Sequence, residues 1–459
     1  MRVLVFGTGD YYQRYKKWLN QVEIPALIDN DSNKQGQIID GVEVISPNQI
    51  NKFEYDKILI LSFCYKEMKA QLISLGVDEQ RIFHFYTIRR LIDWKKNRCP
   101  RIEYGELDYC NKAKKVLLLS PELNNGGPAI ALFHVALEIK KRGFQVVVGS
   151  MIDGELRERY LREGIPVIID FNLQMSVMKE EKWVHSFDLI FCNTLNFYVF
   201  LSERNLNVPC IWWLHEADFF YDAVDEEVLK KIPLHNMRIV AVGDIPKNAL
   251  KRYLTNAKVS DLLYSVEDLK TNKKVAEEGA LELAVIGYLE EIKGHDILLS
   301  ALNLLPEEKK NQVKLLIVGY DLTLYGAWLK RNFAGMTNVE FLGVMQREQL
   351  HALYEEIDML VCPSRQDSMP TVVAEAMMHG KASIVSDAIG TTKYIQDGQN
   401  GLIFHSQSEE ELAKKIEWCI DNRDFLPVMG KNARKTYEEV FSEKAFEKTL
   451  KNLLKDMYE

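Results

Sequence analysis

Short runs of apolar residues alternate with amphipathic helical patterns along almost the whole chain. This alternation is typical of α/β proteins, in which parallel strands form sheets that are covered by helices. Polar or charged stretches separate three blocks of this kind. The pattern therefore predicts three Rossmann-like domains, of which the first is the smallest.

The boundaries of the blocks follow from the polar stretches between them. Residues 1–92 form the first block, and residues 93–112, which are polar and show no clear period, are interpreted as a linker. The second block covers residues 113–266, the third covers residues 279–440, and a closing helix is expected over 441–459. In the third block, apolar runs predict strands at 283–286, 314–318, 339–342, 359–362, 383–385 and 401–403.

Composition narrows the function classes. The chain has 459 residues, 47% of them hydrophobic, and a formal net charge of −8, which excludes a general attraction to nucleic acid. Its seven cysteines are scattered and show no metal-ligand spacing, so we expect reduced packing residues in a cytoplasmic protein. No apolar stretch approaches the roughly 18 residues of a membrane helix. We expect a soluble protein that is able to work at the inner face of a membrane.

The segment from Pro363 to Gly380 joins an apolar strand to an amphipathic helix. Pro370 suits the first helical turn, and the exposed N–H groups and positive dipole end of that turn can hold a phosphate. Asp367 lies in the loop, whereas Glu375 lies two turns into the helix, where its carboxylate can accept both hydroxyls of a ribose. A nucleotide sugar carries the diphosphate and the ribose that such a site would bind.

Other strand-to-helix turns offer further binding groups. In the third block, Lys293 offers a positive charge for a diphosphate, and Gly343 follows a strand where it can frame a base. Arg365 can either donate to a phosphate or pair with Asp367, and both alternatives stay open. In the second block, Gly126 and Gly127 allow close approach of a ligand, and His215 ends an apolar strand at the edge that faces a cleft.

These residues resemble the donor-site signature of retaining glycosyltransferases of family 4 over about residues 113–459. The family has the GT-B fold, in which two Rossmann-like domains face each other. Its pattern is a carboxylate, seven residues and then a glutamate; here Asp367 stands first and Glu375 second. Tyr288 occupies the place of a usual arginine. The resemblance implies catalytic roles for His215, Lys293, Asp367 and Glu375, and donor contacts from Gly126, Gly127, Gly343, Arg365, Ser368, Met369, Pro370 and Thr371.

The function that this resemblance implies is transfer of a sugar, with retention, from a nucleotide-diphosphate sugar to an acceptor hydroxyl. The acceptor would be a glycan or a lipid-linked glycan in cell-surface polysaccharide or glycoconjugate synthesis, with no metal or other cofactor. Tyr288 and Asp367 keep open a second reading, in which a transferase-like protein senses a sugar nucleotide without catalysis.

The first block carries its own nucleotide-like motif. Gly7 and Gly9 follow a strand, but Tyr12 stands where a third glycine is expected, and Asp29 ends the second strand. The block resembles the small Rossmann-like domains that precede sugar-modifying enzymes such as sugar acyltransferases. We therefore consider an accessory nucleotide site at Gly7, Gly9 and Asp29, with a nicotinamide-dependent enzyme, a structural domain and a partner-docking domain as the alternatives.

Overall fold

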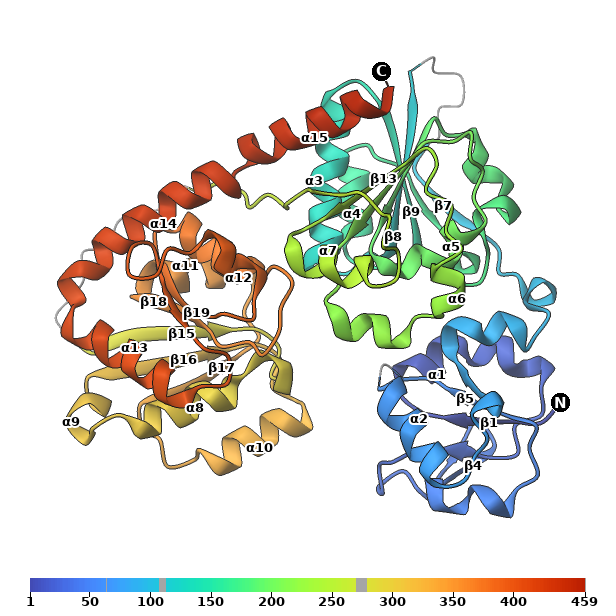
Figure 1. Cartoon of the computed structure of the whole chain (residues 1–459), viewed down its shortest axis with the longest axis horizontal. Coiled ribbons are helices and arrows are strands. Elements are labelled where there is room, and N and C mark those ends of the chain that lie inside the picture. Colours follow the sequence, from blue (N-terminus) through green and yellow to red (C-terminus); the bar gives the residue numbers. More distant parts are fainter. Residues whose placement is uncertain (63, 107–112, 270–278, 459) are drawn as a thin grey trace. The chain divides into compact units, whose positions relative to one another are not determined.

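The computed structural model describes residues 1–62, 64–106, 113–269 and 279–458. The chain divides into two compact units (Figure 1). The first unit comprises residues 1–239 and 248–258, and the second unit comprises residues 240–247 and 259–459. The described residues form the α/β fold that the sequence predicts, with mostly parallel sheets flanked by helices.

The first sheet has the strand order β3-β4-β2-β1-β5-β6, and only the β3–β4 pair is antiparallel. Buried apolar side chains fill β1, which lies at the centre of the sheet. The strands are β1 (Val3–Phe6), β2 (Leu27–Ile28), β3 (Ile38–Ile39), β4 (Val42–Ile45), β5 (Lys57–Ile60) and β6 (Ile82–His84), and the helices are α1 (Asp10–Tyr15) and α2 (Tyr65–Ser74).

The second sheet belongs largely to the first unit, where its strands run in the order β12-β11-β8-β9-β10-β7. Its strands are β7 (Ile102–Tyr104), β8 (Lys115–Glu122), β9 (Gln145–Ile152), β10 (Val167–Ile169), β11 (Leu189–Asn193) and β12 (Cys210–Leu214), followed by β13 (Met237–Ala241) and β14 (Val259–Asp261). The helices are α3 (Gly127–Lys141), α4 (Leu156–Arg162), α5 (Tyr198–Ser202), α6 (Glu226–Leu229) and α7 (Asp244–Lys251).

The segment interpreted as a linker contains structure. β7 pairs with β10 in antiparallel orientation and forms the edge of the second sheet. Residues 107–112 of the same segment, including Cys110, lie outside the described residues.

The first two sheets share a core inside the first unit. Trp18 and Met175 are buried in one apolar cluster, and the rings of Trp18 and Phe171 lie 5.3 Å apart. Asn172 exchanges two hydrogen bonds with the backbone of Cys99, at 2.9 and 2.8 Å. The first block is therefore packed against the second block through buried side chains.

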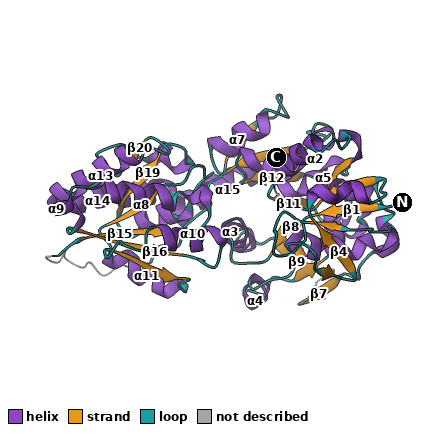
Figure 2. Ribbon diagram, turned by 90° about the horizontal axis from the view of Figure 1, so that it is seen from below, coloured by secondary structure: helices purple, strands orange, loops and turns teal. Residues whose placement is uncertain are grey.

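The third sheet lies in the second unit and is parallel throughout, in the order β17-β16-β15-β18-β19-β20. Its strands are β15 (Leu281–Ile286), β16 (Val313–Val318), β17 (Val339–Gly343), β18 (Met359–Cys362), β19 (Ala382–Ser386) and β20 (Leu402–Phe404). The helices are α8 (His295–Leu304), α9 (Glu307–Lys310), α10 (Leu324–Asn332), α11 (Arg347–Glu356), α12 (Thr371–Met378), α13 (Glu409–Asp421), α14 (Leu426–Val440) and α15 (Glu443–Tyr458). In Figure 2, α13 and α11 lie on opposite sides of β15 and β16.

Each sheet has one place where the order of its strands changes direction. In the third sheet this place lies between β15 and β18, because β16 follows β15 on one side and β19 follows β18 on the other. In the second sheet it lies between β8 and β11, and in the first sheet between β1 and β5. In open α/β sheets, ligands bind at the carboxyl ends of strands beside such switch points. The loops that follow these six strands are therefore the places to search for function.

Candidate functional site

Two loops meet at the switch point of the third sheet, and glycine allows them to come together. The loop after β15 ends in Gly294, whose φ is +70°. A Cβ atom there would lie 2.2 Å from the carbonyl oxygen of Pro363, which begins the loop after β18. Only glycine fits this contact. The contact brings Lys293, just before Gly294, next to Asp367.

Lys293 and Asp367 form an ion pair, with 2.7 Å between Nζ and Oδ2. Burial disfavours the charge of Lys293, but the charge and hydrogen bond of Asp367 outweigh it and raise the pKa of Lys293 above its ordinary value. The other oxygen of Asp367 accepts a hydrogen bond from the backbone N–H of Met369. Lys293 is thus charged and held at the carboxyl edge of the sheet.

Arg365 does not pair with Asp367, so that alternative is wrong. Its guanidinium forms two hydrogen bonds with Asp296, at 2.9 and 2.6 Å, and a third with the carbonyl oxygen of Glu291. Tyr325 also donates to Asp296, at 2.5 Å. Although burial alone would raise the pKa of Asp296, these hydrogen bonds lower it. Arg365 therefore fastens the loop after β18 to the first turn of α8.

The helix after this loop starts one residue later than expected. Pro370 has extended backbone angles, φ −61° and ψ 120°, and is the N-cap of α12 rather than a member of its first turn. The carboxylate of Glu375 consequently lies on the fifth residue of the helix, about one turn in. The N-cap has no side-chain hydrogen bond, so the first N–H groups of α12 are not capped by it.

Tyr354 holds one oxygen of Glu375. The phenol donates to Oε2 at 2.9 Å from the neighbouring helix α11. Among the described residues, no hydrogen bond to the other carboxylate oxygen of Glu375 is found. Burial raises the pKa of Glu375 above its ordinary range. The carboxyl group is therefore oriented by one protein partner and keeps one oxygen for a ligand.

The remaining donor-site candidates of the third block also lie at strand ends or loops. Gly343 ends β17 with a φ of +69°. Ser368 and Met369 are buried, and Thr371 begins α12. The backbone of Ser368 packs closely on Gly390: a Cβ atom added to Gly390 would lie 1.8 Å from the carbonyl oxygen of Ser368. These residues shape the loop around Asp367.

In the second block, Gly126 follows β8 at the switch point between β8 and β11, and His215 follows β12, the strand beside β11. Gly126 is the N-cap of α3 and Gly127 its first residue. The Nε2 atom of His215 lies 2.8 Å from the side-chain oxygen of Asn193. Asn193 donates its amide to Pro128, so its oxygen accepts, and this network assigns the proton of His215 to Nε2. Burial lowers the pKa of His215 to about 3, which keeps the ring neutral.

Glu216 is a second titratable group here; the sequence places it beside His215 at the strand end, but the sequence alone assigns it no role. Its two carboxylate oxygens accept from the backbone N–H groups of Leu195 and His215, each at 2.9 Å. Burial outweighs these bonds and raises the pKa of Glu216 to about 7. Its raised pKa depends on burial among the loops after β11 and β12, which the sequence pattern does not show.

In the first block, Asp29 supports the turn after β1. It accepts from the backbone N–H of Thr8 at 3.1 Å, from the Thr8 hydroxyl, and from the N–H of Asp31 at 2.9 Å. The ammonium of Lys34 lies 3.3 Å away. Both oxygens of Asp29 are therefore occupied, one by Thr8, which lies between Gly7 and Gly9, and the other by the loop of Asp29 itself.

No helix in the described part of the chain combines the length and the apolar character that a membrane crossing requires. Within the same residues, no group of three or more His, Cys, Asp or Glu side chains is arranged to hold a metal ion.

Comparisons with known proteins identify the family. Residues 266–436 match the model of "Glycosyl transferases group 1", residues 112–259 match "Glycosyl-transferase family 4", and residues 1–83 match "C2185-like, N-terminal". Spore coat protein SA of Bacillus subtilis is 26% identical over 368 residues, which are 73% of this chain and 95% of that protein. An uncharacterized glycosyltransferase of Methanocaldococcus jannaschii is 25% identical over 319 residues, 63% of this chain and 80% of that protein.

Solved structures agree on the fold. HepE of Anabaena in complex with UDP-glucose superposes with a TM-score of 0.61 at 19% identity, covering 74% of this chain and 99% of that one. Sucrose-phosphate synthase of Thermosynechococcus elongatus also gives 0.61, at 17% identity, covering 75% and 99%. The chain therefore contains the two domains of a GT-B glycosyltransferase of the family 4 type, and a C2185-like domain precedes them.

Proposed function

We propose that this chain transfers a sugar from a nucleotide-diphosphate sugar to an acceptor hydroxyl, with retention of configuration at the anomeric carbon. The observation that carries the proposal is the cluster at the switch point of the third sheet, where Lys293, Asp367 and the start of α12 converge. The HepE structures with UDP and UDP-glucose support a nucleotide-sugar donor.

In this proposal, Lys293 stabilises the negative charge of the diphosphate. When the bond between the sugar carbon and the phosphate oxygen breaks, negative charge grows on the departing phosphate. The side chain of Lys293 is half-buried, so its attraction to that charge is stronger than between two groups in bulk water. To reach the phosphate it must loosen its bond to Asp367, which frees the Asp367 carboxylate for hydroxyls of the transferred sugar.

Glu375 and Arg365 have different tasks in this proposal. Glu375 offers its uncommitted oxygen to the ribose, while Tyr354 fixes the orientation of the carboxyl group. The bonds of Arg365 to Asp296 keep the loop in place, so we assign Arg365 to positioning the donor site rather than to the phosphate. The uncapped start of α12 supplies N–H groups for the diphosphate.

His215 and the Gly126–Gly127 turn supply the contacts from the second block. Because the ring of His215 is neutral and its Nε2 proton is committed to Asn193, its Nδ1 atom is an acceptor. It suits a sugar hydroxyl better than it suits proton transfer. In the retaining reaction the acceptor oxygen bonds to the sugar carbon on the face that the phosphate leaves, and the phosphate takes the proton.

We further propose that no metal ion takes part, because Lys293 and the start of α12 supply the positive charge. The acceptor is proposed to be a glycan or a lipid-linked glycan, and the protein to work in the cytoplasm, at the inner face of a membrane when the acceptor is lipid-linked. The six cysteines in the described residues are free thiols, which suits that compartment.

A sugar-nucleotide sensor is the second candidate, and Tyr288 favours it. Its side chain, at the place of the usual arginine, is 62% exposed and packs on Tyr320 rather than on the donor cluster. The diphosphate therefore loses one cation in comparison with the family pattern.

One experiment separates the two candidates. The purified protein is incubated with a panel of nucleotide sugars and simple acceptors, and products are read by mass spectrometry, with Lys293→Ala beside the wild type. Transfer or donor hydrolysis that disappears in Lys293→Ala supports the transferase. Donor binding without any turnover supports the sensor and refutes the transferase.

A further inference from the structure

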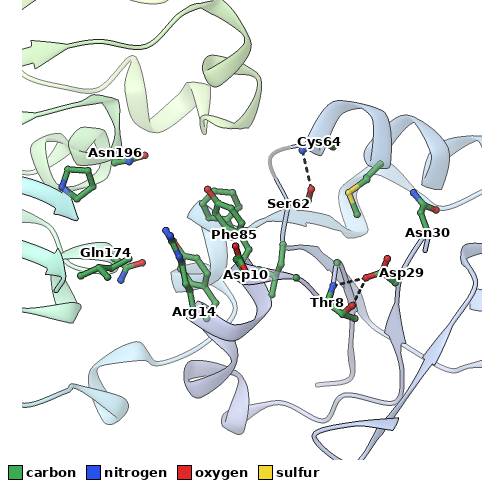
Figure 3. Close-up of a pocket in the computed structure, with 18 of the residues that line it drawn as sticks. Thr8, Asp10, Arg14, Asp29, Asn30, Ser62, Cys64, Phe85, Gln174 and Asn196 are labelled. Carbon is green, nitrogen blue, oxygen red and sulfur yellow. Dashed lines mark hydrogen bonds between the residues drawn. The ribbon is translucent and has the colours of Figure 1, made fainter. Parts of the chain in front are cut away.

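A cavity of 860 Å³ opens in the first unit, at the switch point of the first sheet. Its floor is built from the loops after β1 and β5. The last residues of β8 and β9 and two short 3-10 turns of the second block complete its walls. This volume lies in the range of small-molecule sites. In Figure 3, Arg14 and Asp10 of α1 lie on one side, with Gln174 and Asn196 of the second block opposite. The packing of the first block against the second therefore creates a ligand-sized space.

The charges that line this cavity disfavour a diphosphate. Four carboxylates, those of Asp10, Asp29, Glu67 and Glu122, line the cavity together with one cation, Arg14, which lies 3.5 Å from Glu122. Lys34, which is not part of the lining, pairs with Asp29. The helix α1 has only six residues and begins with an acidic one, so it offers no anion site. An anionic ligand would meet repulsion from most of the charged wall.

The uncharged part of the wall combines aromatic rings with amides. The rings of Tyr11 and Tyr15 pack on Phe85 at 4.6 and 5.4 Å between centroids. Asn30 and Gln71 pair with each other through two hydrogen bonds. The amide nitrogen of Gln174 is buried and has no hydrogen-bond partner among the described residues. A buried donor of this kind costs free energy until a ligand satisfies it.

Hydrogen-bond inventory points to one class of ligand. Carboxylates only accept hydrogen bonds, whereas the Gln174 nitrogen only donates. A phosphate, which only accepts, would serve Gln174 but not the carboxylates of Asp10, Glu67 and Glu122, whereas that of Asp29 is already occupied. A hydroxyl both donates and accepts, so a ligand with several hydroxyls can bond to the carboxylates and to the Gln174 nitrogen. If this ligand is a cyclic sugar, its apolar ring face can also pack on the aromatic rings.

We propose that this cavity binds a neutral carbohydrate. The site belongs to the first unit and uses none of the donor-site residues Lys293, Asp367 and Glu375, so it is a second sugar site, independent of the proposed transfer reaction. Its ligand also differs from the nucleotide that the Gly7–Gly9 motif suggests.

Hydrogen exchange on the full-length chain tests the proposal. The probes are glucose, galactose, N-acetylglucosamine, maltose and cellobiose, each at millimolar concentration, with UDP and NAD for comparison. At about ten times its Kd, a binding sugar should slow exchange of the amides at 8–14 and 172–176 by about tenfold. Slowing by UDP or NAD alone, or by none of the five sugars, would overturn the proposal.

Gly9→Tyr fills the cavity and gives the matched variant. Gly9 has φ −81°, and a Cβ there meets nothing within 4 Å, so the backbone accepts a side chain. Gly335→Tyr, in the second unit and equally open, is the control. We expect sugar protection to disappear in Gly9→Tyr and to persist in Gly335→Tyr and in Lys293→Ala. Protection that survives in Gly9→Tyr would place the sugar elsewhere and refute the site.

Gln174→Met provides a second, gentler variant. It removes the unpartnered donor and keeps the volume, so the fold should be as stable as the wild type or more so. Sugar affinity should fall by about tenfold, the usual effect of one lost hydrogen bond to a ligand. Unchanged sugar affinity would show that Gln174 donates no hydrogen bond to the sugar and would contradict the proposed binding mode.

Discussion

Substitution of Glu216 by glutamine should remove part of the pH dependence of the free energy of unfolding. The folded protein holds this carboxyl at a pKa of about 7, against an ordinary value of 4.5, because the group is buried. Between these two pH values the folded state binds more protons than the unfolded state, so rising pH destabilises the fold. In the wild type, the free-energy cost of ionising the buried carboxyl is small at pH 5 and nearly complete above pH 7. Glutamine, which is neutral throughout, does not incur it.

The magnitude follows from the same two values. One pKa unit corresponds to about 1.4 kcal/mol, so the full free-energy cost is about 3.5 kcal/mol, and about 2.5 kcal/mol of it develops between pH 5 and pH 8. The stability of Glu216→Gln relative to wild type should therefore rise by about 2.5 kcal/mol over this range. The neighbouring His215, with a pKa of about 3, stays neutral in both proteins and cancels from the comparison.

Native-state hydrogen exchange of the β12 amides measures this difference. The method reads the opening of one sheet and does not require both units to unfold together. Glu227→Gln, an exposed position in the same unit, controls for the change of residue type. If the free-energy profiles of Glu216→Gln and wild type run parallel from pH 5 to pH 8, the buried carboxyl is not protonated in the fold and the reasoning is refuted.

Three further substitutions test the donor site and the core. Glu375→Gln should weaken donor binding by about 1.5–3 kcal/mol, as for a lost charge-assisted hydrogen bond, and calorimetry that finds unchanged affinity would contradict the ribose assignment. Lys293→Ala should lower kcat by about 10²-fold with a smaller effect on donor affinity, whereas near-normal turnover would show that backbone groups stabilise the leaving diphosphate. Trp18→Ala should destabilise the first unit by about 3–5 kcal/mol, and an unchanged melting curve would mean that the two blocks are not packed through this core.

The strands of the third sheet could be predicted within one or two residues, and β7 could not. Buried parallel strands are apolar at nearly every position, as Met359–Cys362 shows, so the sequence pattern is strong. β7 is three residues long, lies at a sheet edge and is mostly exposed, so nothing in its composition distinguishes it from a linker. Its place depends on pairing with β10, which is a tertiary contact.

The same distinction holds inside the candidate site. Lys293 and Asp367 could be selected from the sequence because each follows a strand, and strands of one parallel sheet end at a common edge. The partner of Arg365 could not be selected, because Asp296 is 69 residues away and two carboxylates compete for two cations in one small space. The structure resolves this competition with Lys293 on Asp367 and Arg365 on Asp296.

Arg365 and Lys293 are held by their carboxylate partners with different strength. The fork of Arg365 matches a carboxylate through two hydrogen bonds, whereas Lys293 is held by a single bond. The lysine is therefore the cation that can leave its partner at the lower cost when a diphosphate arrives. Arg365→Lys should then weaken the loop without replacing the paired hydrogen bonds, and Lys293→Arg should bind Asp367 more firmly and slow turnover. Faster turnover in Lys293→Arg would show that release from Asp367 is not part of the reaction.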